Sequence, residues 1–242
     1  MASKLLFMKA LPLSILFLSS CDKAAQNNSD NATLAAVPNV PETKDIVPST
    51  PGNGRKAKLL DAAEPFEVLT ETAFDQDTKK VDAAIAKANA AAPTIRPSLT
   101  APAQSEFDKR LAEIKAARAA GNRADLAQSS IEIYRILVSE GAGGSPVPSE
   151  VSLLDYAGFR YMADLQATPI RWHDMVAATS FAKQNWAIIR PQIKDTATVT
   201  KFQAVIDNMA AGAAIKNADR AKASGGAELD LVDVLEKSFN AP

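Results

Sequence analysis

The chain has 242 residues, of which 47% are hydrophobic and 23% are charged, with a formal net charge of −1 and a single cysteine. This near-neutral charge argues against a nucleic-acid-binding protein, which would present a basic face. One cysteine cannot form an intramolecular disulfide, so the fold has to be stabilised by its apolar core alone.

The first twenty residues place a short apolar segment behind two lysines. Lys4 and Lys9 supply positive charge, and Ala10 to Leu18 form the run "ALPLSILFL". This run is about half as long as the ~20 apolar residues that a helix needs to cross a bilayer. The pattern therefore predicts a signal peptide over residues 1–20 and not a permanent transmembrane helix.

The apolar run ends in "LSSC", in which Cys21 follows an aliphatic residue and two small residues. This arrangement resembles the lipobox of bacterial lipoproteins. The resemblance implies that Cys21 is lipidated, that the signal is cut before it, and that acyl chains anchor the protein to a membrane of the bacterial cell envelope, facing the periplasm. In that family an aspartate directly after the modified cysteine can favour the inner membrane; here that residue is Asp22, and the choice between inner and outer membrane stays open. The alternative is an ordinary secretory signal with an incidental cysteine.

The next stretch, residues 21–57, is polar, contains four prolines and has no aromatic residue. It offers too little apolar surface to offset the entropy of ordering, so we expect a flexible tether. From Lys58 onward the composition changes to alanine, leucine, isoleucine and charged residues. Residues 58–242 are long enough for one domain with its own core.

Apolar residues in this domain recur at helical spacing, and strand patterns are almost missing. A first helix carries Val81, Ile85 and Ala88, with Asp77 as its N-cap and the proline-rich "APTIRPSLTAP" after it. Further stripes predict helices around residues 107–118, 126–137, 151–165, 172–186, 199–213 and 231–239. The expected fold is all-α, an irregular bundle of six or seven helices.

Capping and breaking residues predict where several of these helices begin and end. Gly121 ends the second helix, and Ser149 can cap the fourth. Thr168 and Pro169 suit the cap and first turn of the fifth helix. Gly225 and Gly226 are expected to separate the last two helices.

Aromatic and arginine side chains gather in two places and are candidates for binding a partner or a ligand. Tyr156, Phe159 and Arg160 spread around one helix, and Trp172 and His173 lie in another. Tyrosine, tryptophan and arginine are enriched at binding hot spots. A helix that is apolar on several sides has to be covered, either by the rest of its own bundle or by a partner.

His173 is the only histidine, and its helix offers no second metal ligand, because Val176 and Ala177 occupy the i+3 and i+4 positions. A metal site would need carboxylates from other helices, and a haem would need a methionine opposite His173. The candidate ligands are Asp155, Asp164, Asp207, Met162, Met175 and Met209. The simpler interpretation is a half-exposed helix residue, and we predict neither a metal site nor a cofactor.

Ser180–Lys183, "SFAK", matches the S-x-x-K nucleophile motif of penicillin-binding proteins and β-lactamases. The companion S-D-N and K-T-G elements are missing, so the match is interpreted as chance and no catalytic residue is predicted. An enzyme with dispersed catalytic residues remains a third hypothesis.

These observations predict a non-enzymatic, membrane-anchored envelope lipoprotein whose helical bundle binds a protein partner. The alternative is a periplasmic bundle that binds a small ligand or a metal around His173 and the neighbouring aromatic residues.

Overall fold

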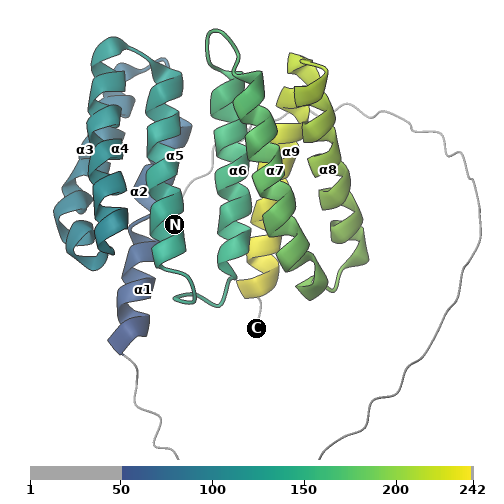
Figure 1. The fold of residues 1–242 in the computed structure, drawn as a ribbon, viewed down its shortest axis with the longest axis horizontal. Coiled ribbons are helices and arrows are strands. Elements are labelled where there is room, and N and C mark those ends of the chain that lie inside the picture. The colour runs from purple at the N-terminus through teal and green to yellow at the C-terminus, as the bar shows by residue number, and fades with distance from the viewer. Residues whose placement is uncertain (1–50, 241–242) are drawn as a thin grey trace, which may run out of the picture. The chain divides into compact units, whose positions relative to one another are not determined.

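The computed structural model describes the backbone of residues 51–240 and the side chains of residues 54–240. The expected signal peptide, Cys21 and most of the expected tether lie outside these residues. The described part is helical throughout, as the sequence predicts (Figure 1). Its α-helices are α1 Pro51–Asp61, α2 Glu64–Thr72, α3 Thr78–Ile95, α4 Ala101–Ala120, α5 Arg123–Glu140, α6 Ser149–Leu165, α7 Trp172–Ile189, α8 Thr196–Ala214 and α9 Ala218–Asn240, with short 3₁₀ turns η1 Arg96–Ser98 and η2 Arg190–Gln192.

The helix count exceeds the expected six or seven because α1 and α2 precede the first predicted helix. The first described helix therefore begins at Pro51, inside the stretch assigned to the tether. Proline suits a first helical turn, where its missing N–H is not needed. Leu59 is buried at the other end of α1, and this contact attaches α1 to the rest of the unit.

Helices α6–α9 form a closed four-helix arrangement, which we call the C-terminal ring. Each helix packs on the next, and α9 returns to pack on α6 (Figure 1). Trp186 stacks on Phe202 inside this ring, with ring centroids 4.5 Å apart. The core contains two apolar clusters, one around Trp186 and Phe202 and the other around Tyr161 and Met209.

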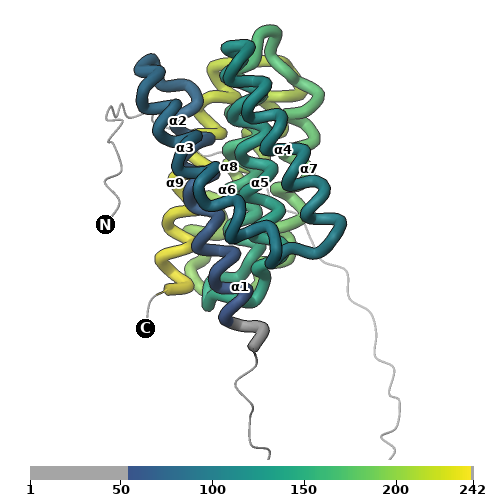
Figure 2. Tube along the Cα trace, turned by 90° about the vertical axis from the view of Figure 1, so that its left-hand side faces the viewer, coloured from purple at the N-terminus to yellow at the C-terminus, as the bar shows by residue number. Residues whose placement is uncertain are grey.

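Helices α2–α5 form a second arrangement, the N-terminal ring, in which α2 packs on α3 and α5, and α4 packs on α5. Two ion pairs join the remaining sides: Arg118 of α4 with Asp82 of α3, and Arg96 of η1 with Asp108 of α4. Phe66 and Phe107 meet edge to face in its core. From the side, the long helices of both rings run in roughly the same direction, up or down (Figure 2).

The two rings share one junction, where α5 packs on α6. Tyr156 and Ala163 of α6 belong to the same apolar cluster as the N-terminal core. Helix α6 therefore contacts α5, α7 and α9 and is covered on several sides. The described residues form a pair of four-helix rings, with α6 as the helix common to both cores.

Two helix ends match the sequence prediction. Asp77 caps α3 by accepting a hydrogen bond from the Lys79 backbone N–H at 3.0 Å. Gly121 ends α4 with a φ of 67°, a left-handed conformation that glycine adopts without a Cβ penalty. The expected cap at Ser149 is wrong, because Pro148 is the N-cap of α6 and Ser149 is its first residue, without a side-chain cap hydrogen bond.

Three further expected boundaries are wrong. Helix α3 continues through Pro93 to Ile95, and α7 begins at Trp172, after Thr168 and Pro169. Helix α9 is continuous through Gly225, where a Cβ would lie 2.6 Å from the sulfur of Met162. That glycine allows α9 to approach α6 closely, so it serves packing and does not break the helix.

No helix among the described residues is long and apolar enough to cross a membrane.

Candidate functional site

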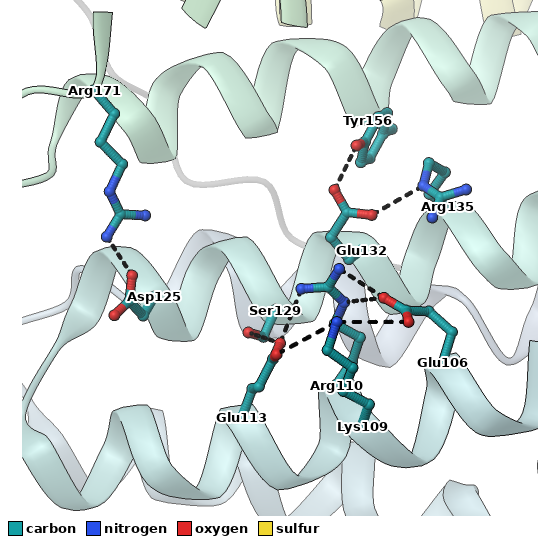
Figure 3. A network of polar contacts seen from close by, with 10 residues as sticks. All are labelled: Glu106, Lys109, Arg110, Glu113, Asp125, Ser129, Glu132, Arg135, Tyr156 and Arg171. Carbon is teal, nitrogen blue, oxygen red and sulfur yellow. Dashed lines mark hydrogen bonds and ion pairs between the residues drawn. The ribbon is translucent and has the colours of Figure 1, made fainter. Parts of the chain in front are cut away.

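Polar side chains line both sides of the α5–α6 junction, and on one side they centre on Glu132 of α5. The Tyr156 hydroxyl donates to Glu132 Oε1 at 2.6 Å, and Arg135 Nε donates to Oε2 at 3.0 Å (Figure 3). Burial alone would raise the pKa of Glu132, but the hydrogen bond from Tyr156 and the charge of Arg135 outweigh it and lower the pKa. Glu132 is therefore an ionised, fully partnered carboxylate that ties the two rings together.

The same side of the junction continues toward α4. Arg110 contacts Glu106 at 2.6 Å and Glu113 at 2.9 Å, and Ser129 donates to Glu113 at 3.1 Å (Figure 3). These residues extend the network of α5 and α6 across the N-terminal ring.

A second tie crosses the junction where α7 begins. Arg171, the N-cap residue of α7, pairs with Asp125 of α5 (Figure 3). Its other terminal nitrogen lies 3.9 Å from Asp164 Oδ1, and its backbone N–H donates to the Asp164 carbonyl at 3.1 Å. Arg171 thus stands between a half-exposed carboxylate on α5 and a buried one on α6.

Three buried polar atoms on this side of the junction have no hydrogen-bond partner: Gln128 Oε1, Arg160 Nε and Asp164 Oδ2. Asp164 is only 1% exposed. Burial, followed by the charge of Asp174, raises its pKa to about 7, although Arg160 and Arg171 oppose the shift. This carboxyl group changes its charge near neutral pH.

On the other side of the junction, a pocket of about 220 Å³ opens between the two rings. Helices α1, α2, α5, α6 and α9 and the connection from α5 to α6 all contribute to its wall. Its lining residues are Leu60, Ala63, Glu64, Glu67, Tyr134, Val138, Ala142, Gly143, Ser145, Val147, Ser149, Ser152, Glu236 and Asn240. Three of them are glutamates and none is a lysine or arginine, although Lys56 of α1 lies next to Gly143 at the rim.

Further carboxylates lie near this pocket. Burial raises the pKa of Asp155 on α6 well above its usual range, and the charges of Glu67 and Glu228 add to that effect. Burial and the charges of Asp155 and Glu67 also raise the pKa of the Tyr134 hydroxyl. These acids therefore oppose one another's ionisation, and a positively charged group placed between them would relieve that repulsion.

Glu228 of α9 is the most deeply buried carboxyl group of the C-terminal ring. It is 0% exposed, and neither of its oxygens has a hydrogen-bond partner. Burial raises its pKa well above the usual range. A Cβ added at Gly158 of α6 would lie 2.0 Å from Glu228 Oε2, so this glycine leaves the space that the carboxyl group occupies.

The candidate binding residues from the sequence do not form one exposed surface. Tyr156 is 1% exposed and belongs to the Glu132 network, so it does not offer a surface to a partner. Phe159 packs partly buried against the N-terminal core, and Arg160 donates to the Tyr156 hydroxyl at 3.1 Å. The apolar sides of α6 are covered by α5, α7 and α9 of the same chain.

Trp172 and His173, although adjacent in the chain, differ in exposure. Trp172 packs against the cluster around Tyr161 and Met209, whereas His173 is exposed. No group of three histidine, cysteine, aspartate or glutamate side chains within the described residues is arranged to hold a metal ion. Ser180, from the S-x-x-K match, donates its hydroxyl to the Val176 carbonyl at 2.9 Å.

The sequence reasoning missed the carboxylates of the pocket and of the junction. The sequence indicates Asp155 and Asp164 only as possible ligands of a metal held by His173. A signal was available, because both lie among apolar residues in a helix that has few polar positions. Glu67, Glu228 and Glu236 carry no such signal, since their helices expose many charged residues.

No family model, no curated protein and no solved structure matches the chain.

Proposed function

We propose that this chain is a bacterial envelope lipoprotein, anchored through Cys21, whose helical unit binds a protein partner that inserts a lysine or arginine side chain into the pocket between the rings. The observation that carries the proposal is the composition of that pocket: three glutamates and no basic residue in its lining, with Asp155 nearby. The partner is thus defined by its charge.

The size of the pocket favours a protein partner over a small molecule. Small-molecule sites typically enclose about 300–1,000 Å³. A volume of about 220 Å³ is below that range and suits a single side chain. Arginine is also among the residues that carry most of the energy in protein interfaces. A partner would contact the rim of the pocket as well, where Ser145 and Asn240 are exposed.

The anchor rests on the "LSSC" sequence. Two or three acyl chains hold a protein on a bilayer firmly, since each buried CH₂ contributes about 0.8 kcal/mol. We predict that Cys21→Ser moves the protein from the membrane fraction to the soluble fraction of a bacterial host, and that it abolishes incorporation of labelled palmitate. A variant that stays with the membranes would contradict the anchor and leave the pocket proposal standing.

The pocket proposal is tested by photo-cross-linking in the envelope of the host. A benzophenone amino acid at Ser145 is expected to cross-link one partner protein, and the same amino acid at the distant, exposed Lys115 of α4 is the control. Mass spectrometry of the conjugate should place a lysine or arginine of the partner beside the cross-link. The double variant Glu64→Gln, Glu236→Gln removes two negative charges from the lining and should abolish it.

Two outcomes would overturn the pocket proposal. One is a cross-link at Ser145 that survives the loss of both glutamates. The other is a native mass spectrum of the purified chain that contains a small amine in place of a partner, which would support the small-ligand alternative.

A further inference from the structure

Arg171 lies between two carboxylates on opposite sides of the junction and can form an ion pair with either. Asp125 belongs to α5 of the N-terminal ring, and Asp164 belongs to α6 of the C-terminal ring. One terminal nitrogen of Arg171 pairs with Asp125, whereas the other is 3.9 Å from Asp164, beyond hydrogen-bond distance. In this structure Arg171 therefore bridges the two rings.

The charged groups that face Asp164 come from its own helix and from α5 and α7. Arg160 lies on its own helix, Glu132 on α5, and Asp174 on α7, with Arg171 at the start of that helix. Asp164 Oδ2 and Arg160 Nε are a buried acceptor and a buried donor on neighbouring turns, and both lack a partner. An ionised Asp164 would gain from both arginines, because a buried charge is costly unless it is paired.

We propose that the corner formed by Asp125, Asp164 and Arg171 is a proton-controlled clasp between the two rings. When Asp164 is neutral, Arg171 is held by Asp125 and closes the corner, as the structure shows. When Asp164 loses its proton, the buried carboxylate draws Arg171 away from Asp125. The rings then remain joined on this side of the junction by the contacts of Tyr156 with Glu132 and Arg135, and the corner opens.

Because Asp164 is more buried than Asp125, an ionised Asp164 competes successfully for Arg171. The side chain of Asp125 is 46% exposed, so water can solvate its charge after Arg171 leaves. The side chain of Asp164 is 1% exposed, so its charge has no such substitute. An exposed ion pair is worth little, whereas an unpaired buried charge is strongly destabilising. Burial places the pKa of Asp164 at about 7, so the proportion of its charged form changes most between pH 6 and pH 8.

The clasp is tested by measuring the distance between the rings in the chain from Asp22 onward, which keeps every described residue and lacks the native cysteine. Spin labels are attached to Ala119→Cys at the end of α4 and Ala214→Cys at the end of α8, both exposed positions. We expect one narrow distance distribution at pH 6, and at pH 8 a longer, broader one. The ratio of charged to neutral Asp164 rises about 100-fold over this range.

Three variants test which side chains cause the change in distance. Asp164→Asn, which cannot ionise, should give the narrow distribution at both pH values. Arg171→Gln cannot form the ion pair with Asp125 and should give the broad distance distribution at both pH values. Asp155→Asn removes another buried acid of α6 and should keep the response of the unmodified chain. Circular dichroism confirms that each variant is helical before its distances are compared.

The proposal would be overturned by a distance distribution that does not change between pH 6 and pH 8. It would also be overturned if the change survives Asp164→Asn or is lost in Asp155→Asn. The clasp does not depend on the pocket or on the anchor, because its residues lie on the other side of the junction and all belong to the described part of the chain.

Discussion

The N-terminal ring buries one carboxylate, the fully partnered Glu132, whereas the C-terminal ring buries three. Asp82 and Asp108 of the N-terminal ring accept hydrogen bonds from Arg118 and Arg96, and these contacts lower the pKa of both acids. In the C-terminal ring, burial raises the pKa of Asp155, Asp164 and Glu228. Near neutral pH, the charges of the acids in the N-terminal ring therefore stay constant, whereas those of the buried acids in the C-terminal ring can change.

The contrast shows that two helical arrangements of similar size can obtain their stability in different ways. Exposed ion pairs contribute little to stability, so the N-terminal ring depends on its apolar core. The C-terminal ring has an apolar core as well, and part of its gain is offset by carboxyl groups without partners. Such groups are retained at a cost in stability, which is typical of sites that serve a function.

The largest expected effects come from removing one aromatic side chain from each core. Phe107→Ala and Phe202→Ala should each lower the free energy of unfolding by about 3–5 kcal/mol, because both residues are fully buried and each would leave a cavity. Urea denaturation should still show a single transition for both variants, since Tyr156 and Ala163 of α6 are part of the N-terminal core. Two separate transitions would mean that the rings unfold independently.

A smaller effect, of opposite sign in the two rings, is expected from a matched pair of substitutions. Glu228→Met replaces a carboxyl group without partners by an apolar side chain of similar length, and should stabilise the protein by about 1–3 kcal/mol. Glu132→Met removes the partner of Tyr156 and Arg135 and should destabilise it by about 1–3 kcal/mol. If both changes shift stability in the same direction, the presence of hydrogen-bond partners does not explain how these two glutamates differ in their effect on stability.

The last expected effect is a dependence of stability on pH. Between its usual pKa and about 7, folded Asp164 holds a proton that the unfolded chain has released, so the free energy of unfolding falls as pH rises through this window. Asp155 and Glu228 act in the same direction. Asp82 and Asp108, with lowered pKa values, lose their contribution only in stronger acid.

Thermal unfolding at pH 5 and pH 8 measures this dependence. One pKa unit corresponds to about 1.4 kcal/mol, and each kcal/mol shifts Tm by about 2–4 °C in a protein of this size. We expect Tm to be higher at pH 5 by on the order of 5–10 °C, and the difference to shrink in Asp164→Asn. A protein that is more stable at pH 8 would show that the surface carboxylates dominate.

The sequence predicted the helical class and most helices because local periodicity decides them. Phe107 and Ile114 lie on one face of α4 and are buried, as their spacing indicates. Gly225 shows where a prediction from local sequence fails. Glycine usually breaks a helix, but here it stands inside α9 because a larger residue would collide with Met162 of α6. The aromatic positions of α6 were ambiguous for the same reason, since one sequence does not state whether its own helices or a partner cover a face.

The candidate site could be predicted only in fragments. Asp155 and Asp164 stand out within an apolar helix, but their neighbours Glu67, Glu228 and Arg171 come from three other segments of the chain. Which charges meet across a junction depends on how the rings pack, and helical periodicity does not contain that information. The partners of a buried acid, and therefore its charge at neutral pH, follow only from the tertiary structure.

The return of α9 to α6 also determines the order in which the molecule can fold during synthesis. The N-terminal ring and the part of α6 that completes its core are present once residue 165 has been made. The C-terminal ring cannot close until α9, the last helix, is complete, and closing contacts between segments far apart in sequence is slow. Until then the face of α6 that carries Gly158 stays open, and Glu228 enters the interior in the final step.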